Sequence, residues 1–89
     1  MKSDFQLQQI STMLKHLLMA LKHCNRYRDL KDLSYDINTD EVVITFYGYM
    51  KEDHTREIFT SRVNVKDESY ADIIHDVENY LHRFFARED

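Results

Sequence analysis

A continuous apolar stripe over the first 24 residues constrains this chain more than any other feature. Its members are spaced by three, four, three, four and three residues, which is typical of one face of an α-helix: Leu7, Ile10, Leu14, Leu17, Leu21 and Cys24. Ser3, with Gln6 three residues later, matches a capping box. We therefore predict a helix of about 22 residues that begins after Ser3 and ends near Asn25 or Tyr27. Cys24, at the end of the stripe, is expected to be a buried, unreactive thiol.

The periodicity changes from 3.6 to 2 after this helix, which indicates strands. Leu33, Tyr35 and Ile37 alternate with polar residues and predict a first short strand. The range 42–50 is rich in β-branched and aromatic residues and is the clearest strand, and a third is expected over about 56–65. Because only short polar links separate these segments, they favour an antiparallel meander.

A second helix is expected near the end of the chain. Acidic and hydroxyl side chains at 67–72 suit a helix start, since they can accept bonds from its first amides. Apolar residues follow at helical spacing: Tyr70, Ile73, Ile74, Val77, Leu81, Phe84 and Phe85. The order is therefore α-β-β-β-α. We predict a single α+β domain over residues 1–89, a two-layer sandwich with both helices on one face of the sheet.

Composition excludes several classes of protein. Hydrophobic residues make up 43% of the chain, which is typical of a globular domain, and the chain has no proline, one glycine and one cysteine. No segment resembles a signal peptide or a membrane span, so a cytoplasmic protein is expected. Histidines recur seven residues apart within each helix, too far to share one ion. The sequence thus predicts no catalytic residues, no metal and no cofactor.

One end of the first helix is a candidate interface. The predicted helix is about 33 Å long, whereas strands of seven to nine residues reach about 23–30 Å. Phe5, Leu7 and Ile10 would then extend past the sheet and favour a second copy of the chain. The alternative is that the whole stripe belongs to the core.

The sheet face away from the helices is a second candidate interface. Alternation places Val42, Ile44, Phe46, Gly48 and Met50 on the core face. Tyr47 and Tyr49 then lie on the outer face, where Ile58 or Phe59 could join them. Such a face suits a protein partner, stacked bases or an ordinary half-solvated sheet.

Charge is unevenly distributed along the chain. Residues 1–31 carry a net charge of +4 and residues 32–89 carry −8. Five basic residues form a candidate nucleic-acid contact: Lys15, Lys22, Arg26, Arg28 and Lys31. The alternative is that these cations complement the dipole at the end of the first helix.

The element order resembles that of double-stranded-RNA-binding domains. Those domains begin their second helix with lysines, whereas this chain has the acidic run 67–72 there. The comparison therefore argues against RNA binding. An acidic surface could instead mimic nucleic acid in the basic groove of a partner, although a solvated surface is the commoner meaning.

Together these features predict a small cytosolic, non-enzymatic protein-interaction or regulatory module. We expect a homodimer, with another protein as the second candidate partner and with no membrane, metal or direct nucleic-acid partner. The general character is similar to small accessory proteins of bacteria and phages. A nucleic-acid-linked role, by contact or by mimicry, is the alternative.

Overall fold

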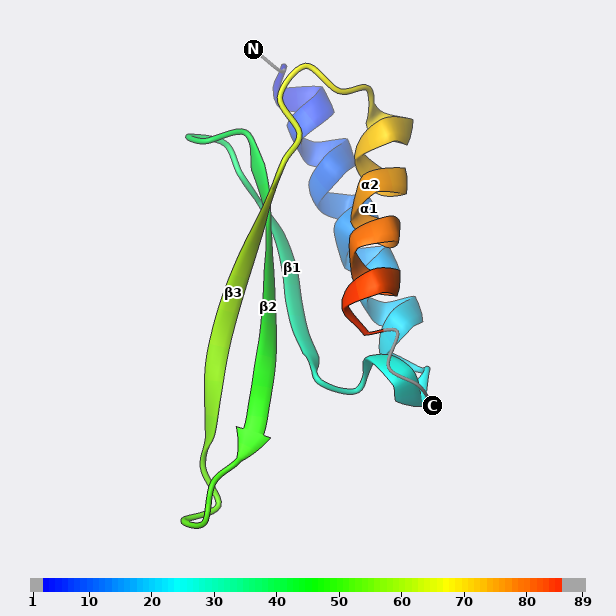
Figure 1. The fold of residues 1–89 in the computed structure, drawn as a ribbon. Coiled ribbons are helices and arrows are strands. Elements are labelled where there is room, and N and C mark those ends of the chain that lie inside the picture. The colour runs from blue at the N-terminus through cyan, green and yellow to red at the C-terminus, as the bar shows by residue number, and fades with distance from the viewer. Residues whose placement is uncertain (1–2, 86–89) are drawn as a thin grey trace.

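A computed structural model describes residues 3–85 of the chain. It contains the elements α1 (Asp4–Lys22), the 3₁₀ turn η1 (Asn25–Tyr27), β1 (Leu30–Asp36), β2 (Glu41–Met50), β3 (Arg56–Asn64) and α2 (Tyr70–Phe84). The strands form one antiparallel sheet in the order β1-β2-β3, and both helices lie on one side of it (Figure 1). The predicted α-β-β-β-α sandwich is confirmed.

Helix α1 begins as predicted and ends earlier than predicted. The Ser3 hydroxyl accepts a bond from the Gln6 amide at 3.2 Å, and Gln6 Oε1 accepts one from the Ser3 amide at 2.8 Å. The helix stops at Lys22 because the backbone turns extended at Cys24, with φ −95° and ψ 128°. The predicted end near residue 25 is therefore wrong. So is the predicted burial of Cys24, which is exposed beyond the helix.

Strand β1 starts at Leu30, three residues before the start of the predicted alternation. Leu30 is fully buried and pairs with Phe46, so the strand gains a core position there. Ile37 follows the end of the strand and is exposed. Strands β2 and β3 match their predicted ranges to within one residue.

The core consists of ten buried apolar side chains, contributed by both helices, β1, β2 and the residue after β3: Ile10, Leu14, Leu30, Leu33, Val42, Ile44, Val65, Ile73, Val77 and Leu81. Strand β3 itself contributes no fully buried apolar side chain among the described residues. The helices therefore cover β1 and β2 more completely than β3.

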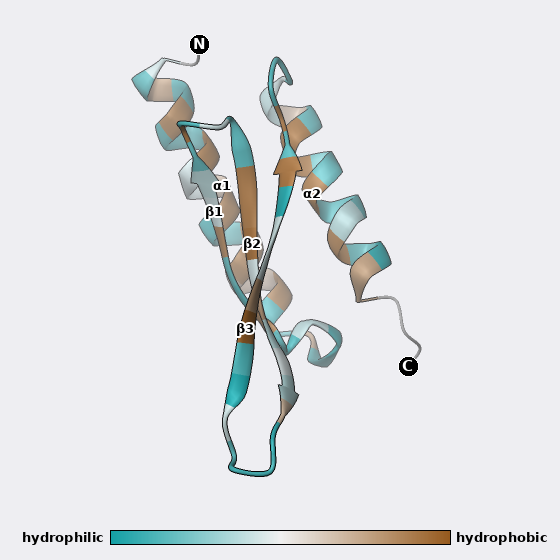
Figure 2. Ribbon diagram, turned by 60° about the vertical axis from the view of Figure 1, so that its left-hand side comes forward, coloured by the Kyte–Doolittle hydropathy of each residue, from teal (hydrophilic) through white to brown (hydrophobic). Residues whose placement is uncertain are grey.

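The molecule is elongated because the β2–β3 hairpin runs past the ends of both helices (Figures 1 and 2). Its extents are 45 × 24 × 18 Å and its radius of gyration is 13.9 Å, whereas a compact chain of this length has a radius of about 12 Å. Helix α1 has 19 residues and β2 has 10, which correspond to about 28 Å and about 33 Å. The larger overhang thus belongs to the sheet.

Candidate functional site

Exposed apolar side chains gather at the end of the molecule that the helices leave uncovered. Five of them lie on the β2–β3 hairpin or on the last turn of α2, and we call them the hairpin patch: Tyr49 (87% exposed), Met50 (61%), Ile58 (54%), Phe59 (44%) and Phe84 (38%). The patch includes both faces of the hairpin, because Phe59 stacks on Phe46 on the helix face and Ile58, the preceding residue, points to the outer face. Figure 2 shows a hydrophobic band on β3 at about the level where the helices end, and the hairpin beyond this band is mostly hydrophilic or neutral. Exposed apolar surface of this kind, concentrated in one region, is typical of an interaction site.

A chain of aromatic contacts supports the patch from the helix side. Phe84 lies 4.6 Å from Phe46 between ring centroids, and Phe46 stacks on Phe59 at 5.8 Å. Phe84 also contacts Phe85 at 4.9 Å and Tyr80 at 5.9 Å. The end of α2 is therefore fixed to the hairpin by ring packing, which is worth more than burial alone.

Gly48 is the only glycine of the chain, and it provides the space for the Phe59 ring. A Cβ atom at this position would lie 2.6 Å from Phe59 Cε2. Any other residue here would force the Phe59 ring to shift. The sequence alone gives one hint of this contact, a glycine within an otherwise strong strand, which often marks a close approach.

An irregularity in β2 changes the face on which its last residue lies. Tyr47 pairs with Ile58 and Met50 pairs with Arg56, so β2 has one more residue than β3 between these pairs. Because paired residues share a face, this bulge places Met50 with Tyr47 on the outer face. The prediction that Met50 belongs to the core face is wrong. The predicted alternation does hold earlier in β2, where Val42 and Ile44 are fully buried on the core face.

Ion pairs occupy much of the outer face beside Tyr47. Arg56 lies over the Tyr47 ring at 5.1 Å, and its Nη2 is 2.6 Å from Asp29 Oδ1. Its Nε also donates to the Gly48 carbonyl at 2.8 Å. Arg56 thus covers one face of the half-buried Tyr47 ring, whereas Tyr49 stays exposed.

A second arginine of β3 makes similar bonds at the other end of the outer face. Arg62 Nη1 lies 3.0 Å from Asp36 Oδ2 and 3.1 Å from Glu41 Oε1. The bond from Arg62, followed by one from the Asn38 amide, lowers the pKa of the Asp36 carboxyl. Both arginines of β3 thus reach across the sheet to acidic groups beside β1, on β1 or on β2.

The predicted interface on α1 is divided between the surface and the core. Phe5 is exposed and Leu7 is half-buried. Ile10 is buried at 2% exposure among the core residues. It packs inside this chain because it faces the sheet along with Leu14, and it is not free to meet a partner.

The five basic residues of the candidate nucleic-acid contact are all exposed: Lys15, Lys22, Arg26, Arg28 and Lys31. Arg26 is engaged within the chain, since its Nε donates to the Phe85 carbonyl at 3.1 Å and its guanidinium lies 5.9 Å from the Tyr27 ring. This cation binds the end of α2, where carbonyls lack helical partners. The other four side chains extend from α1, from the segment before β1 and from β1.

Sequence reasoning missed the contribution of α2 to the site. Phe84 reads as an ordinary apolar position of an amphipathic helix, whereas it is 38% exposed and forms part of the hairpin patch. No local signal distinguishes these roles, because they depend on how far the hairpin extends beyond the helix.

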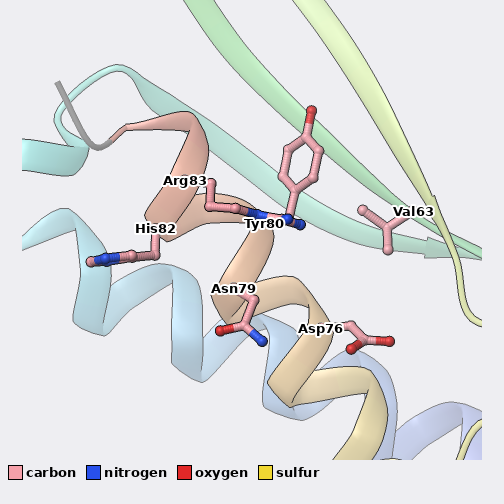
Figure 3. A pocket seen from close by; sticks show the side chains of 6 residues that line it. All are labelled: Val63, Asp76, Asn79, Tyr80, His82 and Arg83. Carbon is pink, nitrogen blue, oxygen red and sulfur yellow. The ribbon is translucent and has the colours of Figure 1, made fainter.

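An open groove lies between α2 and β3 (Figure 3). Its volume is about 400 Å³, and its lining residues are Val63, Asp76, Asn79, Tyr80, His82 and Arg83. Figure 3 shows Tyr80 pointing to the strands, where its hydroxyl bonds Ser61, while Asn79 and His82 point elsewhere. The polar groups diverge along the helix, so they do not surround a common reaction point.

Between residues 3 and 85, no group of three or more histidine, cysteine or acidic side chains could hold a metal ion. No helix in the same range is long and apolar enough to cross a membrane. No protein-family model, curated protein or solved structure matches this chain.

Proposed function

We propose that this chain is a non-enzymatic protein-interaction module that binds its partner through the hairpin patch. One observation carries the proposal: five of the exposed apolar side chains lie on the β2–β3 hairpin or on the end of α2 that contacts it. Burial of apolar surface contributes about 25 cal/mol per Å². Apolar side chains held on a rigid hairpin can therefore supply binding energy without a folding cost.

The rigidity of this region supports binding. The hairpin is fixed to α2 by the Phe46, Phe59 and Phe84 rings and to the segment before β1 by the Arg56–Asp29 ion pair. A preorganised surface loses less entropy on association than a mobile one. The diverging polar groups of the α2–β3 groove support binding over catalysis, since a reaction needs groups that converge.

Two isoleucines of nearly equal exposure provide a matched test. Ile58 lies in the hairpin patch and is 54% exposed, whereas Ile37 lies beyond β1 at 55%. Ile58→Lys should abolish binding of the partner, because the lysine would bury a charge in an apolar interface. Ile37→Lys should bind like the unchanged protein. Binding is measured as retention of partners on immobilised protein, and circular dichroism checks that both variants fold.

Equal binding by the two variants would overturn the proposal. A loss in both variants would also contradict it, because the interface would then not be specific to the hairpin. Phe59→Ser provides a second substitution within the patch, and it should weaken binding in the same way as Ile58→Lys.

A further inference from the structure

Strand β3 forms a free edge of the sheet. Strand β3 is nine residues long and lies at the end of the sheet order, with no other strand beside it in the described part of the chain. An edge strand of this length is a template for another strand unless charges, prolines or bulges block it. We infer that β3 pairs with β3 of a second copy, antiparallel, about a two-fold axis at Thr60. This inference rests on the proposed function and names its partner.

The hydrogen bonding of β2 and β3 shows which groups of β3 are directed outward. The Val65 amide donates to the Asp40 carbonyl at 3.0 Å, in the same register as the rest of the ladder. Bonded pairs alternate along an antiparallel ladder, so Val63, Ser61 and Phe59 also bond β2. The backbone groups directed away from β2 therefore belong to alternate residues: Ile58, Thr60, Arg62 and Asn64.

Strand β3 has three charged side chains, all of them paired within the chain. Its two arginines are directed across the sheet, Arg56 to Asp29 at 2.6 Å and Arg62 to Asp36 at 3.0 Å. Glu57, its single acidic residue, pairs with Lys51 at 3.4 Å. The strand contains no proline. The outward amides and carbonyls are thus accessible to a second strand.

The charge pattern selects the register. Thr60 is the central residue of Arg56–Asn64, so a two-fold axis there pairs all nine residues. Ile58 then lies opposite Arg62 of the second copy, whose alkyl stem can cover it. An axis at Phe59 instead would place Arg56 opposite Arg62 of the second copy, and like charges in direct opposition destabilise a pair.

An axis at Thr60 also places the half of β3 that α2 covers beside the half of β3 that α2 leaves bare in the second copy. Helix α2 reaches the sheet down to Ser61 and Phe46, through the Tyr80 hydroxyl and the Phe84 ring. The rest of β3, towards Arg56, has no helix over it (Figure 1). An axis at Thr60 sets the helix-covered half of one copy beside the bare half of the other. The exposed Phe59 and Phe84 rings lie next to this axis, so both copies would bury them together.

The molecule has enough exposed surface for an interface of standard size. The chain exposes 6349 Å², whereas a folded monomer of 10.8 kDa exposes about 5,500 Å². The elongated shape contributes to this excess of about 800 Å², which is comparable to the area that one partner buries in a standard interface.

Engineered disulfides test both the dimer and its register. In a Cys24→Ser background, Thr60→Cys should form a covalent dimer on mild oxidation, because residues facing across a bonded pair have Cα atoms about 5.5 Å apart, within disulfide range. Ile58→Cys is the matched control, because the cysteines at position 58 of the two chains would lie about 13 Å apart along the strands. It should stay monomeric under the same oxidation. Equal crosslinking of both variants would overturn the register, and crosslinking of neither would overturn the dimer.

Measurements on the unchanged protein keep the test independent of these variants. Light scattering should give twice 10.8 kDa, and amide exchange at Ile58, Thr60 and Arg62 should slow as protein concentration rises. A mass of 10.8 kDa at every concentration would overturn the inference. If Ile58→Lys then still abolished binding of a different protein while Ile37→Lys did not, the proposed function would stand without the second copy. If neither variant changed any binding, both proposals would fail.

Discussion

The two edges of the sheet differ in length, regularity and protection. Strand β1 has seven residues and a bulge between Leu30 and Asp32 that leaves Lys31 as an extra, exposed residue. A lysine at a bulge is a common protection against pairing with another chain. Strand β3 has nine residues, and its arginines are directed away from its edge. The contrast shows that one sheet can close one side to partners and leave the other side open.

The helices also bury the β1 side of the sheet more completely than the β3 side. Helix α1 lies beneath β1, where Leu30 and Leu33 are buried in one core with Ile10 and Leu14. Beneath β3, α2 ends at Phe84, and the Phe59 ring remains 44% exposed. The β1 side therefore provides stability, and the β3 side provides accessible apolar surface. Four experiments test this division, beginning with the largest expected effect.

Leu14→Asp should unfold the domain. Leu14 is fully buried beneath β1, and an unpaired charge there costs several kcal/mol, which is much of the stability of a domain this size. Phe84→Asp is the control beneath β3: its carboxylate can reach water because the position is 38% exposed. Urea denaturation followed by circular dichroism should show a far larger loss for Leu14→Asp. Equal losses would contradict the division.

Gly48→Ala should destabilise the protein by about 1–3 kcal/mol, because the new methyl group must displace the Phe59 ring. A double-mutant cycle isolates this contact. In a Phe59→Ser background the same alanine should be neutral or stabilising, since glycine weakens a strand by about 0.5–1 kcal/mol relative to alanine. The free energy of unfolding of the four proteins is the measurement. Additive effects would show that the ring does not lie over Gly48.

Alkaline pH should weaken the β1 side through Tyr35. Burial, and then the hydrogen bond to Asp40, raise the pKa of Tyr35 from 10.0 to about 12. Because the folded state holds this proton more tightly, its stabilising contribution is complete below pH 10 and is lost as the pH rises towards 12. The melting temperature should fall across this window, and less so in Tyr35→Phe. An equal fall of the melting temperature in both proteins would show that Tyr35 is not the group responsible.

Arg62→Gln should have the smallest effect. Arg62 lowers the pKa of Asp36, so the ionised pair stabilises the fold at a pH above 3.8, and this contribution is lost as the pH falls below that value. The pair is exposed to solvent and therefore weak. Melting curves should show a slightly smaller acid-induced loss in Arg62→Gln than in the unchanged protein. An identical acid response would show that the pair contributes nothing to stability.

Much of the fold is predictable from short-range patterns. The Ser3–Gln6 capping box, the burial of Val42 and Ile44, and the helical spacing of Ile73, Val77 and Leu81 all follow from sequence periods. Each depends on residues within a few positions of one another.

The site was less predictable, because its features depend on distant segments. The sequence places Tyr49 on an open surface, and the structure agrees. It places Met50 in the core, because alternation alone cannot show a bulge, and it extends α1 through Cys24, because the turn after Lys22 carries no proline or glycine to mark it.

The sequence by itself determined the element order, the antiparallel sheet and most of the core, because apolar periodicity fixes which face of each element must leave water. Only the tertiary structure decided that the hairpin extends past both helices, that Phe59 lies over Gly48 and that β3 is left bare. These features depend on the relative lengths and positions of packed elements. Such quantities arise when the whole chain packs, and no local spacing of residues encodes them.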